Sequence, residues 1–225
     1  MPSRNIVVLG AGYHAGVVIE AIQCLQRDRV IGILDDQPSK AGQVIGGVEV
    51  LGPMSLLDSL AREERADAVI LGIGNIRLRK QAVALFRKAQ SLGLKMVTVV
   101  HPAAFVSPSA RLGAGCFVGP GVVIHTNTRL GDGVTIYSGS TVDHDNEVQE
   151  HVFMGPGVHT AGKVTVEAGA YIGPGAVIGS ECRVGAGSIV GAGAVVLEDV
   201  PPGCLVAGVP ARKLKSIAEW EQDKS

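Results

Sequence analysis

The stretch RVGAGSIVGAGAVV (residues 183–196) contains the same six-residue unit twice. The unit consists of an aliphatic residue, a glycine, a short turn and a small residue. Every sixth residue from Val106 to Val196 gives a series of sixteen residues, of which fifteen are aliphatic and one is Thr160. The residue after each is glycine in eight of the sixteen repeats. A six-residue period that holds its phase over this length predicts a parallel β-helix.

The period also predicts the dimensions of the helix. Each six-residue repeat supplies one short strand and one turn, with its aliphatic residue inward, and three repeats close one triangular coil of 18 residues. Sixteen repeats therefore make about five coils, stacked roughly 4.8 Å apart like strands in a sheet. A β-sandwich would need alternation with a period of two and turn signals about every 8–12 residues.

The first hundred residues follow a different pattern, in which strands alternate with helices. Such alternation predicts a small parallel sheet with crossover helices. The expected strands are 5–10, 29–36, 67–72 and 94–100, and the expected helices run from His14 to about Cys24 and over 76–93. We therefore expect an α/β domain over residues 1–100, a β-helix over 101–212 and a short helical tail over 213–225.

Composition and charge exclude several classes of protein. The net charge is −1, which predicts no bulk attraction to nucleic acid or to an anionic membrane, and the apolar runs are too short to span a bilayer. The four cysteines lie far apart without metal-ligand spacing, and the N-terminus lacks the pattern of a signal peptide. We expect reduced thiols and a cytoplasmic protein. The 31 glycines and the scarcity of aromatics predict a core of small and aliphatic side chains.

The motif GAGYHA (residues 10–15) lies between the first expected strand and the first expected helix. A glycine-rich loop at this place lets an anionic group approach the backbone at a helix N-terminus. Asp35 and Asp36 end the next strand, where a Rossmann fold holds ribose hydroxyls. One alternative is therefore a nicotinamide-dependent oxidoreductase, although about 100 residues supply only one mononucleotide half. Another is that the glycines merely allow a tight turn and Asp36 caps a strand.

The segment TVDHDNEV (residues 141–148) carries the candidate catalytic residue. His144 comes two residues after the inward Val142, so we expect it at a coil corner or on the outer surface. A neutral imidazole can accept a proton at physiological pH, and Asp143 or Asp145 could fix its tautomer. The alternative is a solvated polar corner. The histidines between 125 and 159 occupy different phases of the repeat, so we predict no metal site.

Together these motifs resemble a known family. The six-residue repeats, the run VGAGAVVLEDVPPGCLVAGVPAR (190–212) and the small N-terminal α/β domain resemble the NeuD/PglD-type sugar O- and N-acyltransferases, and GAGYHA, LDD, GIGN, HP and DHD occur in the family's order. The resemblance implies a left-handed β-helix, a homotrimer and acetyl-CoA as co-substrate.

The resemblance also implies roles for individual residues. It nominates His144 as general base and Asp145 as the residue that orients it. The remaining implied sites bind the nucleotide sugar (Gly12, Tyr13, His14, Asp35, Asp36 and Gly74) and acetyl-CoA (Phe153, Gly162, Gly173, Pro174, Gly191 and Ala192). Tyr13 replaces a small residue of the family, and Phe153 replaces a histidine that contacts the cofactor.

The expected activity is acetyl-CoA-dependent N-acetylation of the amino group of a nucleotide-linked amino-deoxy sugar, with a 4-amino group as the expected position. The alternatives are O-acetylation of sialic acid or another sugar hydroxyl, and a non-catalytic module that binds a nucleotide sugar. The sequence leaves open the nucleotide (UDP, GDP or dTDP), the sugar and the acyl chain length.

Overall fold

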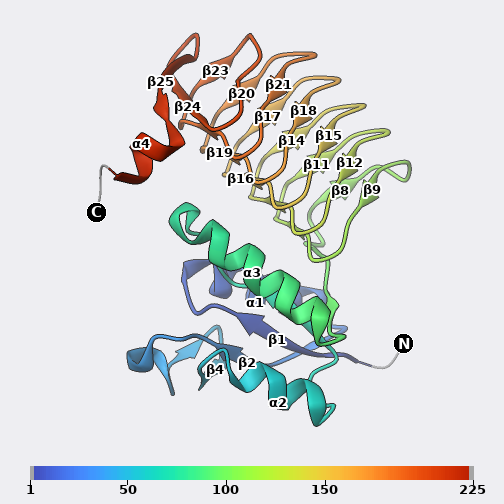
Figure 1. The fold of residues 1–225 in the computed structure, drawn as a ribbon. Coiled ribbons are helices and arrows are strands. Elements are labelled where there is room, and N and C mark those ends of the chain that lie inside the picture. The colour runs from blue at the N-terminus through green and yellow to red at the C-terminus, as the bar shows by residue number, and fades with distance from the viewer. Residues whose placement is uncertain (1–2, 223–225) are drawn as a thin grey trace. The chain divides into compact units, whose positions relative to one another are not determined.

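The computed structural model describes residues 3–222, and the chain divides into two compact units between Pro102 and Ala103. Figure 1 follows the chain through the α/β unit and then through the stacked coils of the β-helix. No helix among residues 3–222 is long and apolar enough to cross a membrane.

The first unit is built on one six-stranded sheet in the order β3-β4-β2-β1-β5-β6. All neighbouring strands are parallel except β3 and β4, which form a hairpin. Its strands are β1 (Asn5–Leu9), β2 (Arg29–Leu34), β3 (Val44–Ile45), β4 (Val48–Gly52), β5 (Ala68–Leu71) and β6 (Lys95–Met96). The helices are α1 (Tyr13–Leu25), α2 (Leu56–Arg62) and α3 (Arg79–Ser91), with 3-10 turns η1 (Pro38–Lys40) and η2 (Ile76–Leu78). The central strand β1 is fully buried from Ile6 to Leu9, as its unbroken apolar run predicts.

The structure corrects three expectations about local elements and adds three elements that were not expected. The expected strand 94–100 is two strands, of which β6 joins the α/β sheet and β7 (Val99–Val100) begins the β-helix. The expected helix 76–93 begins with η2, and β3, β4 and α2 were not expected. At the C-terminus, β25 (Arg212–Ser216) pairs antiparallel with β24 (Cys204–Ala207), so the helix is only α4 (Ile217–Gln222). The end of the expected tail, 223–225, lies outside the described residues.

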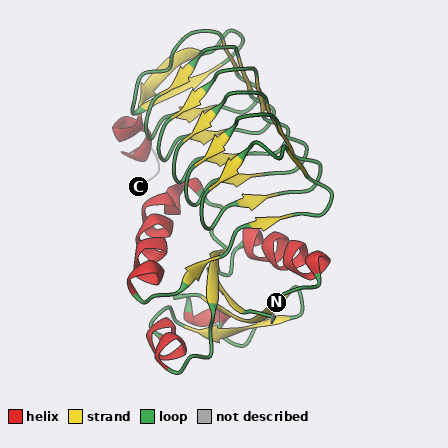
Figure 2. Ribbon diagram, turned by 90° about the vertical axis from the view of Figure 1, so that its right-hand side faces the viewer, coloured by secondary structure: helices red, strands yellow, loops and turns green. Residues whose placement is uncertain are grey.

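The second unit is the predicted left-handed β-helix, and its strands form three sheets that are parallel except at the pair of β24 and β25 (Figure 2). The first of these sheets also takes in β7, just before the division at Pro102. Residues 18 apart pair directly, as Val123 does with Thr141. Sheet I contains β7, β10 (Phe117–Val118), β13 (Thr135–Ile136), β16 (Phe153–Met154), β19 (Tyr171–Ile172), β22 (Ile189–Val190), β24 and β25. Sheet II contains β8 (Phe105–Val106), β11 (Val123–Ile124), β14 (Thr141–Val142), β17 (His159–Thr160), β20 (Val177–Ile178) and β23 (Val195–Val196). Sheet III contains β9 (Arg111–Leu112), β12 (Arg129–Leu130), β15 (Glu147–Val148), β18 (Thr165–Val166) and β21 (Arg183–Val184).

The interior of the β-helix is filled by two residues from each repeat. The second residue of each two-residue strand points inward, and from Val118 onward these residues are at most 4% exposed. The residue two positions earlier is buried as well, which explains why it is small or β-branched, as at Ser140 and Ala176. Burying a Val, Leu or Ile side chain contributes about 1.5–3 kcal/mol, so this double column supplies the stability of the unit.

Each turn between consecutive strands from β9 to β23 has one residue in the left-handed backbone region. Along two of the three corners this residue is glycine, with His151 as the one substitution among the described turns there (φ 57°). Along the corner between sheets II and III it is never glycine, since Asn127, Asp145, Lys163 and Glu181 have φ of 55–63°. A residue with a Cβ pays roughly 1–2 kcal/mol in this region, so this corner carries backbone strain that the other two mostly avoid.

One inward position departs from the aliphatic rule, and it predicts a stabilising substitution. The Thr160 hydroxyl is buried without a hydrogen-bond partner. Thr160→Val replaces that hydroxyl with a methyl group of similar size, and we expect it to raise the free energy of unfolding by about 1 kcal/mol. Urea unfolding followed by circular dichroism measures the change.

Thr128→Val is the matched comparison, because the Thr128 hydroxyl is also interior but donates to the carbonyl of Asp143 at 2.7 Å. This variant should lose stability. Equal effects of the two substitutions would contradict the assignment of a cost to the unpaired hydroxyl.

Candidate active site

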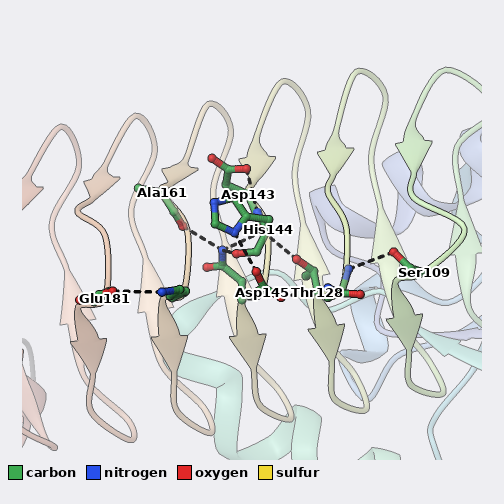
Figure 3. A network of polar contacts seen from close by, with 10 residues as sticks. Ser109, Thr128, Asp143, His144, Asp145, Ala161 and Glu181 are labelled. Carbon is green, nitrogen blue, oxygen red and sulfur yellow. Dashed lines mark hydrogen bonds and ion pairs between the residues drawn. The ribbon is translucent and has the colours of Figure 1, made fainter.

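A polar turn between β14 and β15 holds the candidate catalytic histidine (Figure 3). His144 Nδ1 lies 2.9 Å from Asp145 Oδ2, and about half of each side chain is exposed (49% and 46%). Within the described chain, no group hydrogen-bonds to the other ring nitrogen, Nε2. With Asp145 accepting the Nδ1 proton, Nε2 carries the free lone pair that a general base requires.

The shape of this turn is set by hydrogen bonds from inside the coil. The Asn146 side chain is 1% exposed, and its Nδ2 donates to the carbonyls of Asp143 (2.7 Å), His144 (3.2 Å) and Ala161 (2.8 Å). Thr128 also donates to the Asp143 carbonyl, and the Asp143 carboxylate accepts from the His144 amide at 2.8 Å. The two aspartates therefore divide the work: Asp143 holds the backbone of His144, and Asp145 holds its ring.

Gly162, on the next coil, leaves space for the imidazole. A Cβ at position 162 would lie 2.5 Å from His144 Cε1 and 2.5 Å from Nε2, closer than any real contact. The glycine is itself buried, and its backbone is not in the left-handed region. Its lack of a side chain therefore serves the histidine rather than the backbone.

This contact predicts that Gly162→Ala lowers activity without unfolding the β-helix. The methyl group must displace the His144 ring, and a displacement near 1 Å can cost about a hundredfold in rate. We expect turnover to fall about ten- to a hundredfold while the circular dichroism spectrum is unchanged.

The double variant Gly162→Ala/His144→Ala separates this effect from general damage. If Gly162 acts through the imidazole, the double variant is no slower than His144→Ala alone. A multiplicative loss would place the effect of Gly162 elsewhere.

The charges around the pair keep Asp145 ionised. Hydrogen bonds from His144 and from Asn127 hold the pKa of the Asp145 carboxyl below its ordinary value, and the positive charge of Lys163 acts in the same direction. Asn127 Nδ2 donates to Asp145 Oδ1 at 3.1 Å, so each carboxylate oxygen has its own donor. Asp145 is thus an anion with a fixed orientation at neutral pH.

The residues expected to bind acetyl-CoA fall into two groups within one chain. Gly162 lies beside His144 at the corner between sheets II and III. Phe153 lies on the outer face of sheet I, and the turns with Gly173, Pro174, Gly191 and Ala192 join sheet I to sheet II. The outer face of sheet II separates the two groups, so a single chain does not bring these turns to His144.

Phe153 belongs to a row of aromatic rings along sheet I. It stacks on Tyr171 with ring centroids 5.1 Å apart and planes 8° apart, and Tyr137 lies 5.2 Å away on a tilt of 43°. Ring contacts of this kind stabilise neighbouring coils. Phe153 is therefore held in packing where the resembled family places a histidine.

The residues expected to bind the nucleotide sugar gather at the carboxyl edge of the α/β sheet. Gly12 is the N-cap of α1 after β1, Asp35 and Asp36 follow β2, and Gly74 follows β5. Because β2 and β5 lie on opposite sides of β1, the strand order reverses here, and such switch points are where open α/β sheets bind ligands.

The structure gives Asp35 and Asp36 contacts within the chain. Asp35 accepts from the amides of Ala11 (2.8 Å) and Gln37 and pairs with Lys40 at 3.0 Å, while Asp36 accepts from the Met54 amide at 2.8 Å. Burial raises the pKa of Asp35, but the two amides and Lys40 outweigh it, so the pKa lies below the ordinary value. Asp35 thus ties the glycine loop to the end of β2.

Tyr13 and His14 have opposite environments although they are neighbours. Tyr13 is fully exposed at the start of α1, whereas His14 is 4% exposed, and burial lowers its pKa to about 4. The His14 imidazole is therefore neutral at physiological pH, whereas Tyr13, like Gly12 beside it, is exposed to a ligand in solution.

Residues 3–222 contain no group of three or more His, Cys, Asp or Glu side chains arranged to hold a metal ion. Sequence reasoning missed several residues that support the pair, namely Asn127, Thr128, Asn146 and Lys163. Their signal was the 18-residue length of one coil: Asn127 and Lys163 stand one coil before and one coil after Asp145.

Comparison with known proteins agrees with both units. Residues 5–86 match the PglD N-terminal domain, and residues 98–144 and 163–198 match the bacterial transferase hexapeptide repeats. The fold and the site thus define a hexapeptide-repeat transferase with a PglD-type N-terminal domain.

Two solved structures cover nearly the whole chain. Perosamine N-acetyltransferase from Caulobacter crescentus, solved with CoA and GDP-perosamine as a histidine-to-alanine variant, is 38% identical with a TM-score of 0.87 and covers 94% of this chain and 97% of its own. The acetyltransferase domain of PglB from Neisseria gonorrhoeae, solved with acetyl coenzyme A, is 38% identical with a TM-score of 0.86 and covers 94% and 100%. The chain belongs to this family of sugar N-acetyltransferases.

A curated relative matches over a shorter length. The UDP-N-acetylbacillosamine N-acetyltransferase of Bacillus subtilis is 34% identical over 119 residues, which is 51% of this chain and 51% of that protein. The alignment therefore spans about half of the curated relative.

Proposed function

We propose that this chain transfers the acetyl group of acetyl-CoA to the amino group of a nucleotide-linked amino-deoxy sugar, with a 4-amino group as the expected acceptor. The observation that carries the proposal is the 2.9 Å contact between His144 Nδ1 and Asp145 Oδ2, which leaves Nε2 available as a base. The solved relatives named above, one with CoA and GDP-perosamine and one with acetyl coenzyme A, support this choice of substrates.

The proposed reaction needs one base and no covalent intermediate on the protein. As the sugar amine attacks the thioester carbonyl, a C–N bond forms and Nε2 of His144 takes the proton from the nitrogen. Collapse of the tetrahedral intermediate breaks the C–S bond, and the imidazolium returns the proton to the leaving thiolate of CoA. Asp145 stabilises the imidazolium through Nδ1 and keeps the ring in the useful tautomer.

The N-terminal unit supplies the proposed nucleotide-sugar site. The helix N-terminus at Gly12 favours an anion such as a diphosphate, and it opens at the carboxyl edge of the sheet. Tyr13, His14, Asp35, Asp36 and Gly74 are the other proposed contacts. Since Asp35 already accepts from two amides and Lys40, its proposed role is to shape the loop, with its remaining lone pairs available to the nucleotide.

The activity test is a panel of nucleotide-linked amino sugars assayed with acetyl-CoA, with the release of free CoA thiol as the measurement. His144→Ala should lose about 10²- to 10⁴-fold in turnover, the usual contribution of a general base. Unchanged turnover would remove His144 from the mechanism, and activity confined to sugar hydroxyls would favour O-acetylation.

Asp143→Asn and Asp145→Asn form a matched pair for the same assay. Both neutralise a carboxylate beside His144, but only Asp145 contacts the ring. The Asp145 variant should lose more turnover than the Asp143 variant.

We further propose a homotrimer, on the basis of the three outer faces of the β-helix. The outward residues of sheet III are mostly charged (Arg111, Arg129, Glu147 and Arg183), as suits a solvated face. Those of sheet II are mostly apolar although accessible in the single chain, including Phe105 (56% exposed) and Val177 (38%). Exposed apolar patches mark interfaces. Packing on sheet II would bring the turns with Gly173 and Gly191 of one chain to the corner that holds His144 in its neighbour.

The trimer predicts that a charge on sheet II dissociates the protein. Val177→Glu should reduce the mass from three chains of 23.2 kDa to one in light scattering, and activity should fall with it. Arg111→Glu places the same side chain on sheet III and should leave the trimer intact. A monomeric or dimeric wild-type protein would refute the proposal.

The proposed substrates also suggest the cytoplasm as the place of action. The cysteines Cys24, Cys116, Cys182 and Cys204 form no disulfide, which fits a reducing compartment.

A further inference from the structure

The corner that holds His144 differs from the other two corners of the β-helix in its left-handed turn residues. At the other corners these positions are almost all glycine, whereas here they are Asn127, Asp145, Lys163 and Glu181. Asparagine and aspartate tolerate this backbone region better than most residues, but lysine and glutamate do not. Four consecutive coils thus accept strain at one corner that glycine would remove.

Two side-chain pairs and one bond to the backbone link several of these residues along the stack. The Ser109 hydroxyl accepts from the backbone N–H of Asn127 at 3.1 Å, and the side-chain Nδ2 of Asn127 donates to Asp145 Oδ1 at 3.1 Å. Further along, Lys163 Nζ pairs with Glu181 Oε1 at 3.4 Å (Figure 3). We call these five residues, each 18 positions after the last, the turn ladder.

We propose that the turn ladder is a positioning device for His144, in which Asn127 fixes the Asp145 carboxylate and Lys163 balances its charge. The proposal rests on the proposed function, since it assigns Asn127 and Lys163 to the same base. Neither residue touches the reacting atoms, so both act through Asp145.

The role of Asn127 follows from the exposure of Asp145. A carboxylate with 46% of its side chain exposed can rotate into water, where its hydrogen bond to the imidazole competes with solvent. With Oδ1 held by the Asn127 amide, Oδ2 faces His144 Nδ1. The side-chain amide of Asn127 carries no charge and does not titrate, so Asn127 remains a donor to the Asp145 carboxylate at every pH at which that carboxylate is ionised.

The role of Lys163 is electrostatic. Its ammonium favours the ionised form of Asp145, and the same ammonium pairs with Glu181 on the following coil. The other titratable groups at this corner are Asp143 on the same turn, His125 on the preceding coil and His159 on β17. The charged residues of the turn ladder (Asp145, Lys163 and Glu181) thus contribute to the electrostatic environment of His144.

Asn127→Gly is the informative variant, because it removes the amide and relieves the strain together. The protein should be at least as stable as the wild type, yet kcat should fall about two- to tenfold, as the loss of one hydrogen bond implies. The KM for acetyl-CoA should not change. Glu64→Gly relieves the same backbone conformation in the α/β unit (φ 53°) and should leave kcat unchanged.

Asn127→Asp tests the charge balance with a nearly identical shape. A second carboxylate beside Asp145 favours the imidazolium, so the acidic limb of the kcat/KM profile should move to higher pH. Imidazole NMR of the same variant should show His144 titrating at higher pH than in the wild type, and this readout does not depend on turnover.

The outcomes separate the two proposals. If wild-type protein acetylates no amino sugar, the proposed function fails, whereas the NMR titration still tests the ladder. If the wild type is active but Asn127→Gly retains full kcat, or Asn127→Asp moves neither the rate profile nor the titration, the ladder plays no part in positioning the base.

Discussion

The whole second unit depends on one constraint, the burial of an aliphatic residue at every sixth position. Because three repeats close a coil, residues 18 apart come to lie directly over one another, with pairs such as Ile124 and Val142 in register. A shift of one position would turn the apolar column outward. The interior therefore fixes the register for every outward side chain, including those that share no contact with the core. The precise alignment of Asn127 with Asp145 is inherited from Ile124 and Val142.

The same constraint leaves the outward positions free to differ from face to face. Sheet III carries arginines and a glutamate, sheet I carries aromatic rings, and sheet II carries accessible apolar side chains with Thr141 and His159 in their midst. A residue can change character on one face without disturbing the column beneath it. His144 stands at the corner where the apolar face meets the charged one. At such a corner the proposed base has solvent on one side and the proposed interface on sheet II on the other.

The sequence predicts the β-helix, which the structure confirms, and it predicts the position of His144 on a coil, because both follow from a strict period. The phase of Val142 sets His144 at a corner, and the adjacent Asp145 needs only local geometry to reach Nδ1. Asn127 and Lys163 are distant in sequence, so their roles emerge only once the chain is treated as coils of 18 residues. The strands β6 and β7 fell within one apolar run, and nothing local says that the run changes sheets between them. The hairpin with β25 was missed because Arg212–Ser216 is charged, and its pairing depends on the free edge of β24.

The left-handed turn position at the corner between sheets II and III combines backbone strain with the proposed positioning of the base. Glycine at the left-handed position is the stable choice, and most turns at the other two corners adopt it. A glycine has no side chain with which to orient an imidazole. The corner that holds His144 therefore has residues with side chains at these positions, although glycine would be more stable there. Gly162, one residue before Lys163 on the next coil, shows the reverse. There the absence of a side chain leaves space for the imidazole. The β-helix tolerates both departures because its interior column, from Ile124 to Ile178, continues unbroken beneath them apart from the hydroxyl of Thr160.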